Sequence, residues 1–208
     1  MNRKGRILES LERFKYLRRW HIELLHYKGK KTGQRMCQDA LKKLLEQKFV
    51  KRFRLGPREQ YIYHIGNRGH KWQHTLYMNE FHFSILKDLH SWQKILYWNH
   101  EYKYPFGVAD GLYVIKTTLE GGIKFFVEMD DGGNEFLKVG QYLSYAMNSD
   151  WKKEPWADPL GKGIITFPRV VIMTPRPGEI EPLITETGRV KFTLLSREFD
   201  NILKRIGP

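Results

Sequence analysis

The order of hydrophobic patterns in the first third of the chain constrains the fold most strongly. Apolar residues recur at helical spacing over residues 5–17, in a shorter segment at 20–25, and again over 32–45. Residues 49–54 and 60–64 instead alternate like strands, and a Gly-Pro pair in between is typical of a turn. We therefore expect three helices followed by a two-stranded hairpin.

Three helices followed by a hairpin is the order of a winged helix-turn-helix domain, in which one helix enters the major groove of duplex DNA. On the third helix, long polar side chains face away from the apolar stripe and are the expected readers of base edges. The hairpin, or wing, carries cations suited to phosphates or the minor groove. The candidate DNA-binding residues are Gln34, Arg35, Gln38 and Lys42 on the helix, and Lys51, Arg52, Arg54 and Arg58 on or near the wing.

The positive charge of the chain is concentrated in the same segment. Residues 1–75 contain 20 Lys and Arg against 6 Asp and Glu, a net charge of +14, whereas residues 76–208 contain 16 against 17. This asymmetry favours a polyanion-binding module joined to a module with another task. A solvated basic surface and a protein–protein adaptor are the alternatives, and charge alone does not separate DNA from RNA.

The composition limits the class of protein further. Of the 208 residues 41% are hydrophobic, which is enough for a small domain and a medium one. No stretch approaches the ~18 apolar residues of a membrane-spanning helix, and the basic start lacks the apolar core of a signal peptide. The single cysteine, Cys37, excludes an internal disulfide and a multi-cysteine zinc module. We expect a cytoplasmic protein without a membrane partner.

The pattern changes after the first hairpin, and we place the domain boundary between residues 70 and 71. The order of elements beyond it predicts a mixed α/β domain with a central sheet flanked by helices. The predicted elements are a helix at 74–91, strands at 94–98, 111–116 and 123–129, a helix at 135–147, strands at 169–173 and 191–195, and a helix at 198–206.

Three carboxylates in this second domain are candidates for chemistry. Asp110 is expected to begin a strand, and Glu128 and Asp130 lie two apart on the next strand, so both point to one face. If the two strands form a hairpin, Asp110 lies near both. Mg²⁺ and Mn²⁺ prefer such oxygen ligands, and a metal held there activates water beside a phosphate. The alternative is that Glu128 and Asp130 face solvent at a strand end.

Asp110, followed after seventeen residues by Glu128-Met129-Asp130, resembles the core of the PD-(D/E)XK nuclease superfamily. The lysine that this superfamily has two residues after the glutamate is Asp130 here, and the resemblance suggests Lys116 or Lys138 as its substitute. Gln141-x-x-x-Tyr145 on the next helix is similar to a motif of exonuclease branches, although both Tyr142 and Tyr145 also suit a hydrophobic core. The candidate catalytic residues are Asp110, Glu128, Asp130, Lys116, Lys138, Gln141 and Tyr145, and the candidate metal ligands are Asp110, Glu128 and Asp130.

The whole order resembles the replication-relaxation proteins of plasmids and mobile elements, which join a winged helix to a nuclease-like α/β domain. The resemblance implies a role in replication or relaxation of a bacterial plasmid or integrated element, a plasmid or nucleoid location, and double-stranded DNA as partner. It leaves a homodimer and replication or conjugation proteins open as further partners. The residues that carry it are His74-Thr75-Leu76 with Asn79, Asp110-Gly111, Phe126–Asp130, Gln141–Tyr145, and Phe167–Val171 with Thr174-Pro175.

Two functions follow from these patterns. The first is a DNA endonuclease or nickase that uses Mg²⁺ or Mn²⁺ and is delivered to its target by the winged helix. The second is a non-catalytic replication initiator or transcriptional regulator with a degenerate nuclease fold. The missing lysine at position 130 motivates the second function.

Overall fold

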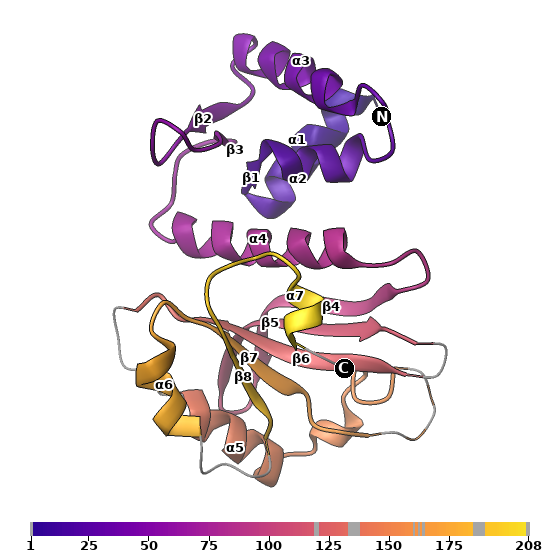
Figure 1. Cartoon of the computed structure of the whole chain (residues 1–208), viewed down its shortest axis with the longest axis vertical. Helices are drawn as coiled ribbons and strands as arrows, with labels where there is room; N and C mark the ends of the chain where they lie inside the picture. Colours follow the sequence, from indigo (N-terminus) through magenta and orange to yellow (C-terminus); the bar gives the residue numbers. More distant parts are fainter. Residues whose placement is uncertain are drawn as a thin grey trace. The chain divides into compact units, whose positions relative to one another are not determined.

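The chain forms two compact units, Met1–Phe83 and Ser84–Pro208 (Figure 1). The computed structural model describes residues 2–118, 121–132, 138–159, 161, 163, 165–184 and 190–206. Helix α4 (Trp72–Asp88) begins in the first unit and ends in the second. The first unit therefore extends beyond the expected boundary at residue 70.

The first unit contains the three expected helices and one strand that the sequence did not indicate. A central strand, β3, pairs antiparallel with a strand on each side, so the sheet order is β1-β3-β2. The elements that precede α4 are α1 (Arg3–Phe14), β1 (Tyr16–Arg18), α2 (Arg19–His26), α3 (Gly33–Glu46), β2 (Lys51–Phe53) and β3 (Ile62–His64).

One boundary of these helices differs from expectation, and one cap is incomplete. The first helix ends before residue 17, because Lys15 adopts a left-handed backbone with a φ of 62° and Leu17 enters β1. Thr32 occupies the N-cap position of α3, but its side chain makes no capping hydrogen bond.

Helix α4 is tied to the first unit by a buried asparagine. The side-chain amide of Asn79 donates hydrogen bonds to the carbonyl oxygens of Phe14 and Tyr16, both at 2.8 Å. Next to it, the Arg18 guanidinium contacts the carboxylate of Glu80 at 2.5 Å. The Asn79 hydrogen bonds satisfy backbone groups at the junction of α1 and β1, and together with the Arg18–Glu80 ion pair they explain why α4 completes this unit.

The second unit is a five-stranded mixed sheet in the order β4-β5-β6-β7-β8. Strands β4, β5 and β6 form an antiparallel meander, and β7 and β8 continue the sheet in parallel with β6. The elements are β4 (Lys94–Tyr104), β5 (Gly107–Lys116), β6 (Gly122–Met129), α5 (Lys138–Asn148), a 3₁₀ turn (Trp151–Lys153), β7 (Arg169–Met173), α6 (Pro177–Ile184), β8 (Phe192–Leu195) and α7 (Ile202–Ile206).

Helices cover both faces of this sheet. Helices α5 and α6 lie on one face and α7 lies on the other (Figure 1). Aromatic rings dominate the core on the α5 side, where Phe126 packs against Tyr142 at a centroid distance of 5.1 Å and against Trp156 at 5.9 Å. The expected mixed fold with a central sheet between helices is confirmed.

Several boundaries in the second unit differ from the sequence prediction. Strand β5 begins at Gly107, so Asp110 lies within the strand instead of opening it, and β4 continues to Tyr104. Helix α6 was not expected, and α7 is shorter than predicted. Residues 135–137 of the expected helix at 135–147 lie outside the described residues. Within the described part of the chain, no helix combines the length and hydropathy needed to cross a bilayer.

Candidate functional site

All eight residues predicted to contact DNA are exposed in the first unit. Helix α3 buries Cys37, Leu41 and Leu44, so its opposite face is left to polar side chains. Burial raises the pKa of the Cys37 thiol to about 12, in agreement with a structural role. The exposed residues are Gln34, Arg35, Gln38 and Lys42 on α3, and Lys51, Arg52, Arg54 and Arg58 on β2 and the segment after it.

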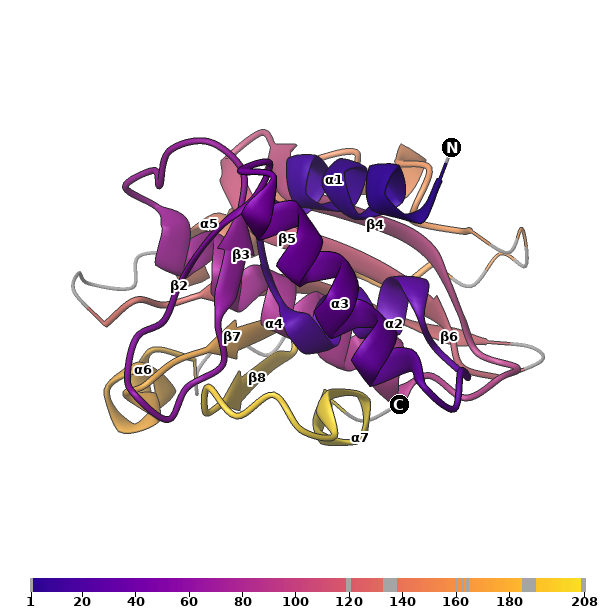
Figure 2. The same cartoon turned by 90° about the horizontal axis from the view of Figure 1, so that it is seen from above.

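A groove separates α3 from the β2–β3 hairpin, and the two elements lie side by side (Figure 2). Its volume is about 420 Å³, and its lining includes Gln38, Lys42 and Arg52 together with the Tyr61 ring. The Arg52 guanidinium lies 4.0 Å from the centroid of that ring, and the Arg54 guanidinium lies 5.5 Å from it. Stacking restricts the rotamers of both arginines and keeps the charge of Arg52 at the groove. The sequence prediction missed Tyr61.

In the second unit, Asp110 and Glu128 lie at one end of the β5–β6 pair. Gly111 on β5 pairs with Val127 on β6 in an antiparallel register. Asp110 and Glu128, the adjacent residues of the two strands, are therefore close neighbours. Lys138, the first residue of α5, joins them: its ammonium donates a hydrogen bond to Glu128 Oε2 and lies 3.9 Å from Asp110 Oδ1. The expected proximity of Asp110 to Glu128 is therefore present, with a lysine cation between them.

Glu128 is almost completely buried, with 1% of its surface exposed. The Tyr142 hydroxyl, one helical turn after Lys138, donates a hydrogen bond to Glu128 Oε1. Burial and, to a smaller extent, the Asp110 charge raise the pKa of Glu128, Lys138 and Tyr142 lower it, and the net result is a pKa of about 8. The interpretation that Glu128 faces solvent is wrong.

Asp130 follows β6 and has a different set of partners. Its carboxylate accepts hydrogen bonds from the Thr174 hydroxyl at 2.7 Å, from the Arg176 guanidinium at 3.1 Å and from the Gly132 amide at 3.0 Å. Burial raises the pKa of Asp130, but these hydrogen bonds outweigh it and lower the pKa below its ordinary value. Asp130 is 8% exposed, so it too is not a solvent-facing residue.

The remaining predicted residues have other positions. Lys116 pairs with Gly122 at the far end of β5, about 20 Å along the strand from Asp110 at ~3.3 Å per residue. Gln141 accepts a hydrogen bond from the Tyr104 hydroxyl at 3.5 Å. Tyr145 is buried in the core and stacks on Tyr104 with ring centroids 4.9 Å apart. Of the two lysines considered, the structure brings only Lys138 to the carboxylates.

Sequence reasoning missed three residues around this site. Tyr142 lies four residues after Lys138, a spacing that places both on one face of a helix and is the signal that could have selected it. Arg176 and Arg197 follow β7 and β8, which run parallel to β6, and the carboxyl ends of parallel strands meet at one edge of a sheet. Arg197 contacts the backbone carbonyl of Asp130 and lies 3.2 Å from the Asp131 carboxylate.

Asp110 and Glu128 are the residues of this site that could hold a divalent cation. Two carboxylates already share one cation, the Lys138 ammonium, and Mg²⁺ is held in proteins by one or two carboxylates with water completing its shell. Over the described ranges, no group of three or more His, Cys, Asp and Glu side chains is arranged to hold a metal ion. Any metal at this site would therefore be held by Asp110 and Glu128, without the third carboxylate expected from the sequence.

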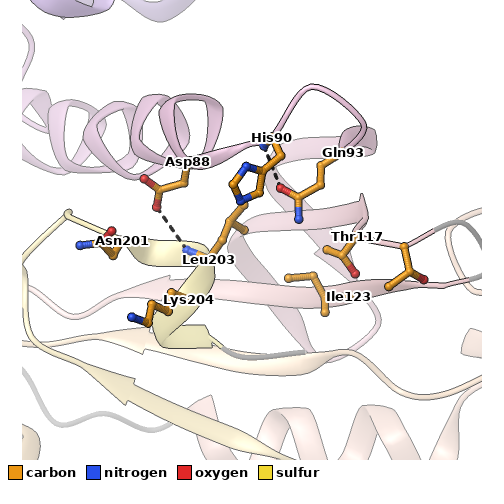
Figure 3. Close-up of a pocket in the computed structure, with 9 residues that line it drawn as sticks. Asp88, His90, Gln93, Thr117, Ile123, Asn201, Leu203 and Lys204 are labelled. Atoms are coloured by element: carbon orange, nitrogen blue, oxygen red, sulfur yellow. Dashed lines mark hydrogen bonds between the residues drawn. The ribbon is translucent and has the colours of Figure 1, made fainter.

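A second cavity, of about 560 Å³, lies at the opposite end of the β5–β6 pair (Figure 3). Thr117, which follows β5, and Ile123 on β6 line it together with residues of α7. At its rim the Asp88 carboxylate accepts a hydrogen bond from the Leu203 amide at 3.4 Å. Its lining contains one carboxylate, so it does not repeat the arrangement at Asp110 and Glu128.

Comparison with known proteins adds no relative. No protein-family model matches the chain, and neither the curated proteins nor the solved structures contain a match to it.

Proposed function

We propose that this protein binds duplex DNA through the face formed by α3 and the β2–β3 hairpin, and that it acts in replication or relaxation of a plasmid or mobile element. One observation carries the first part: the eight polar and cationic residues selected from the sequence are all exposed on one helix and the adjoining hairpin. That face belongs to a segment with a net charge of +14. The second part depends on the family resemblance of the sequence.

The topology of the first unit supports this proposal. The element order and the β1-β3-β2 sheet agree with a winged helix, in which α3 would be the recognition helix and the β2–β3 hairpin the wing. Gln38 and Arg35 have the length and hydrogen-bonding groups to contact base edges. Arg52, stacked on Tyr61, is suited to a backbone phosphate beside the groove.

Selection from a random duplex pool with the full chain tests the proposal. We expect an enriched sequence that the wild-type chain binds more tightly than unrelated duplex, with an affinity that falls steeply as salt rises. Arg35→Ala should weaken this binding by roughly tenfold or more, as expected for one lost bidentate base contact. Lys152→Ala, an exposed change in the second unit, is the matched control. Failure of the wild-type chain to retain any duplex at low salt would refute the proposal.

A second candidate function, a metal-dependent DNA endonuclease or nickase, is favoured by the contact of Lys138 with Glu128. This lysine lies where it can replace the one that the chain lacks at position 130. The order of the strands, an antiparallel meander followed after a helix by a parallel strand, agrees with a nuclease-like core. Asp110 and Glu128 would hold Mg²⁺ or Mn²⁺, which when bound supplies an activated water and neutralises phosphate charge.

Tyr142 and Lys138 would then have separate roles in this activity. Tyr142 fixes the orientation of Glu128, because its hydroxyl is bonded to one carboxylate oxygen while Lys138 holds the other. Lys138 is 31% exposed at its side chain, so its ammonium can also face an incoming phosphate. A cation held in this position stabilises negative charge that develops during phosphodiester cleavage.

Incubation of supercoiled plasmid with the full chain and Mn²⁺ tests the second function. We expect nicked circles from the wild-type chain and none from Asp110→Asn, with equal retention of plasmid by both proteins. Plasmid that is bound but never nicked would leave the non-catalytic initiator or regulator as the function of the chain. Nicking that survives Asp110→Asn would assign the activity to a contaminating nuclease.

A further inference from the structure

In each carboxylate of the candidate metal site, the two oxygens have different partners. Asp110 Oδ2 accepts a hydrogen bond from the Met129 backbone amide at 2.7 Å, and Glu128 Oε1 accepts one from the Tyr142 hydroxyl. The second oxygen of each group, Asp110 Oδ1 and Glu128 Oε2, contacts the Lys138 ammonium. A metal ion held by both carboxylates through these second oxygens would therefore compete with a cation of the chain itself.

The Lys138 ammonium is held at this place by contacts with two strands. It donates hydrogen bonds to Glu128 Oε2 on β6 and to the Val108 carbonyl on β5, the latter at 3.0 Å, and it lies 3.9 Å from Asp110 Oδ1. Three oxygens thus surround a group that has three N–H donors. Lys138 is therefore a positioned cation between the two carboxylates, with a backbone carbonyl as its third neighbour.

We propose that the Lys138 ammonium is a resident cation that a divalent metal ion must displace from Asp110 and Glu128 before the site can act on DNA. This role rests on the second candidate function, in which the two carboxylates hold Mg²⁺ or Mn²⁺. Two cations that need the same carboxylate oxygens repel each other, and the repulsion is strong beside Glu128 because that residue is buried. Binding of the metal ion and release of the lysine are therefore one coupled step.

The side chain of Lys138 can leave the carboxylates while α5 stays folded. It is 31% exposed, and its flexible four-carbon stem can carry the ammonium into solvent by rotation about single bonds. In solvent the ammonium is available to a phosphate of the substrate. Lys138 therefore compensates the charge of the buried Glu128 until a metal ion takes over that role, and only then becomes free to contact DNA.

Titration of the full chain with Mn²⁺, with the free ion measured by electron paramagnetic resonance, tests this inference in the absence of DNA. Lys138→Met should bind Mn²⁺ roughly tenfold or more tightly than the wild-type chain, because one positive charge beside the ion is removed. Addition of Asp110→Asn to Lys138→Met should abolish the gain, which locates it at this site. Lys116→Met, changed at the far end of β5, is the matched control and should leave the affinity unchanged.

Acetylation of lysines in the wild-type chain tests the same step without a substitution, so it decides the question even if Lys138→Met does not fold. An ammonium that has left the carboxylates is less shielded from the reagent. We expect Mg²⁺ to raise the acetylation rate of Lys138 severalfold, as measured by mass spectrometry of its peptide. The rate of Lys152, an exposed lysine of the same unit, should not change.

Two results would overturn the displacement: Mn²⁺ affinity that is unchanged or weaker in folded Lys138→Met, or acetylation of Lys138 that Mg²⁺ does not raise. Either would mean that the ion does not take the place of the lysine, and nicking of plasmid by the wild-type chain would still support the second candidate function. If no protein bound Mn²⁺ and the wild-type chain did not nick plasmid, both the inference and that function would be refuted.

Discussion

The ammonium of Lys138 donates a hydrogen bond to the carboxylate of Glu128, joining the first residue of α5 to a buried position on β6. A buried carboxylate without a cation would be costly, so this contact compensates the burial of Glu128. The same ammonium reaches Asp110 at 3.9 Å. This contact therefore has a structural role in compensating the burial of Glu128, and in the proposed nuclease Lys138 would have a second role at the site of cleavage.

Replacing Lys138 separates these two roles. In Lys138→Met we expect nicking of supercoiled plasmid to slow by about 10²-fold or more, because a positioned group that acts in proton transfer or charge stabilisation contributes on this scale. Initial rates at saturating Mn²⁺ are the measurement, and duplex affinity should not change. Lys116→Met is the control, since Lys116 pairs with Gly122 at the far end of β5. Equal loss in both variants would show that neither lysine acts at the site.

Glu128 makes the stability of the second unit depend on pH. Burial, helped by the Asp110 charge, raises the pKa of Glu128 in the folded state to about 8 against the opposing effects of Lys138 and Tyr142, whereas the ordinary pKa of a glutamate is 4.5. Between these values the folded state binds more protons than the unfolded state, so the free energy of unfolding falls as pH rises. Glu128→Gln removes this pH dependence, because a glutamine side chain does not titrate. We expect its stability relative to the wild-type chain to increase by up to about 1.4 kcal/mol per pH unit across that window.

Urea unfolding of both proteins at pH 5, 6.5 and 8 measures this dependence. Asp130→Asn is the comparison, because the pKa of Asp130 is lowered, mainly by hydrogen bonds from Arg176 that outweigh its burial. Its contribution is fully present above the ordinary pKa of 3.8 and is lost only as pH falls below that value. The difference between Asp130→Asn and wild type should therefore stay constant from pH 5 to 8, while that of Glu128→Gln changes. A constant difference between Glu128→Gln and wild type at all three pH values would contradict the assignment.

Much of the fold could be predicted because its signals are local. The apolar stripe of α3, which includes Leu41 and Leu44, and the short apolar run of β6 are both local patterns in the sequence. The end of α1 at Phe14 could not be predicted, because the left-handed Lys15 has no sequence signature like that of glycine. The role of α4 in the first unit depends on Asn79 reaching carbonyl groups more than sixty residues earlier, which no local pattern records.

The candidate site, like the fold, could be predicted from the sequence only in part. Asp110 and Glu128 could be paired, since consecutive strands form hairpins and the antiparallel register places them together. Asp130 could not be separated from Glu128, because an interval of two residues puts both on one strand face and the strand ends between them. Arg176, the ion-pair partner of Asp130, follows β7. The ion pair therefore depends on the parallel pairing of β7 with β6.

Asn79 is expected to determine whether α4 stays attached to the first unit. Asn79→Ala leaves two buried carbonyl groups, of Phe14 and Tyr16, without their donor, which costs about 1–3 kcal/mol of unfolding free energy. Hydrogen exchange of peptides that cover residues 10–20 in the full chain should therefore accelerate. Gln73→Ala, an exposed change on the same helix, should leave these rates unaltered. Unchanged exchange in Asn79→Ala would mean that other contacts hold the helix.

The two elements of the DNA-binding face are expected to contribute differently to recognition. Arg52→Ala should weaken binding to the selected sequence and to unrelated duplex by similar factors, and should reduce the slope of log K against log salt by about 1, because it removes one phosphate contact. Gln38→Ala should instead cost about 1–3 kcal/mol with the selected sequence alone and leave the salt slope unchanged, because it removes a base contact. Titrations of both variants with both duplexes at four salt concentrations measure these quantities. If Gln38→Ala lowered the slope while Arg52→Ala changed only the selected sequence, α3 would lie along the backbone and the hairpin would contact the bases.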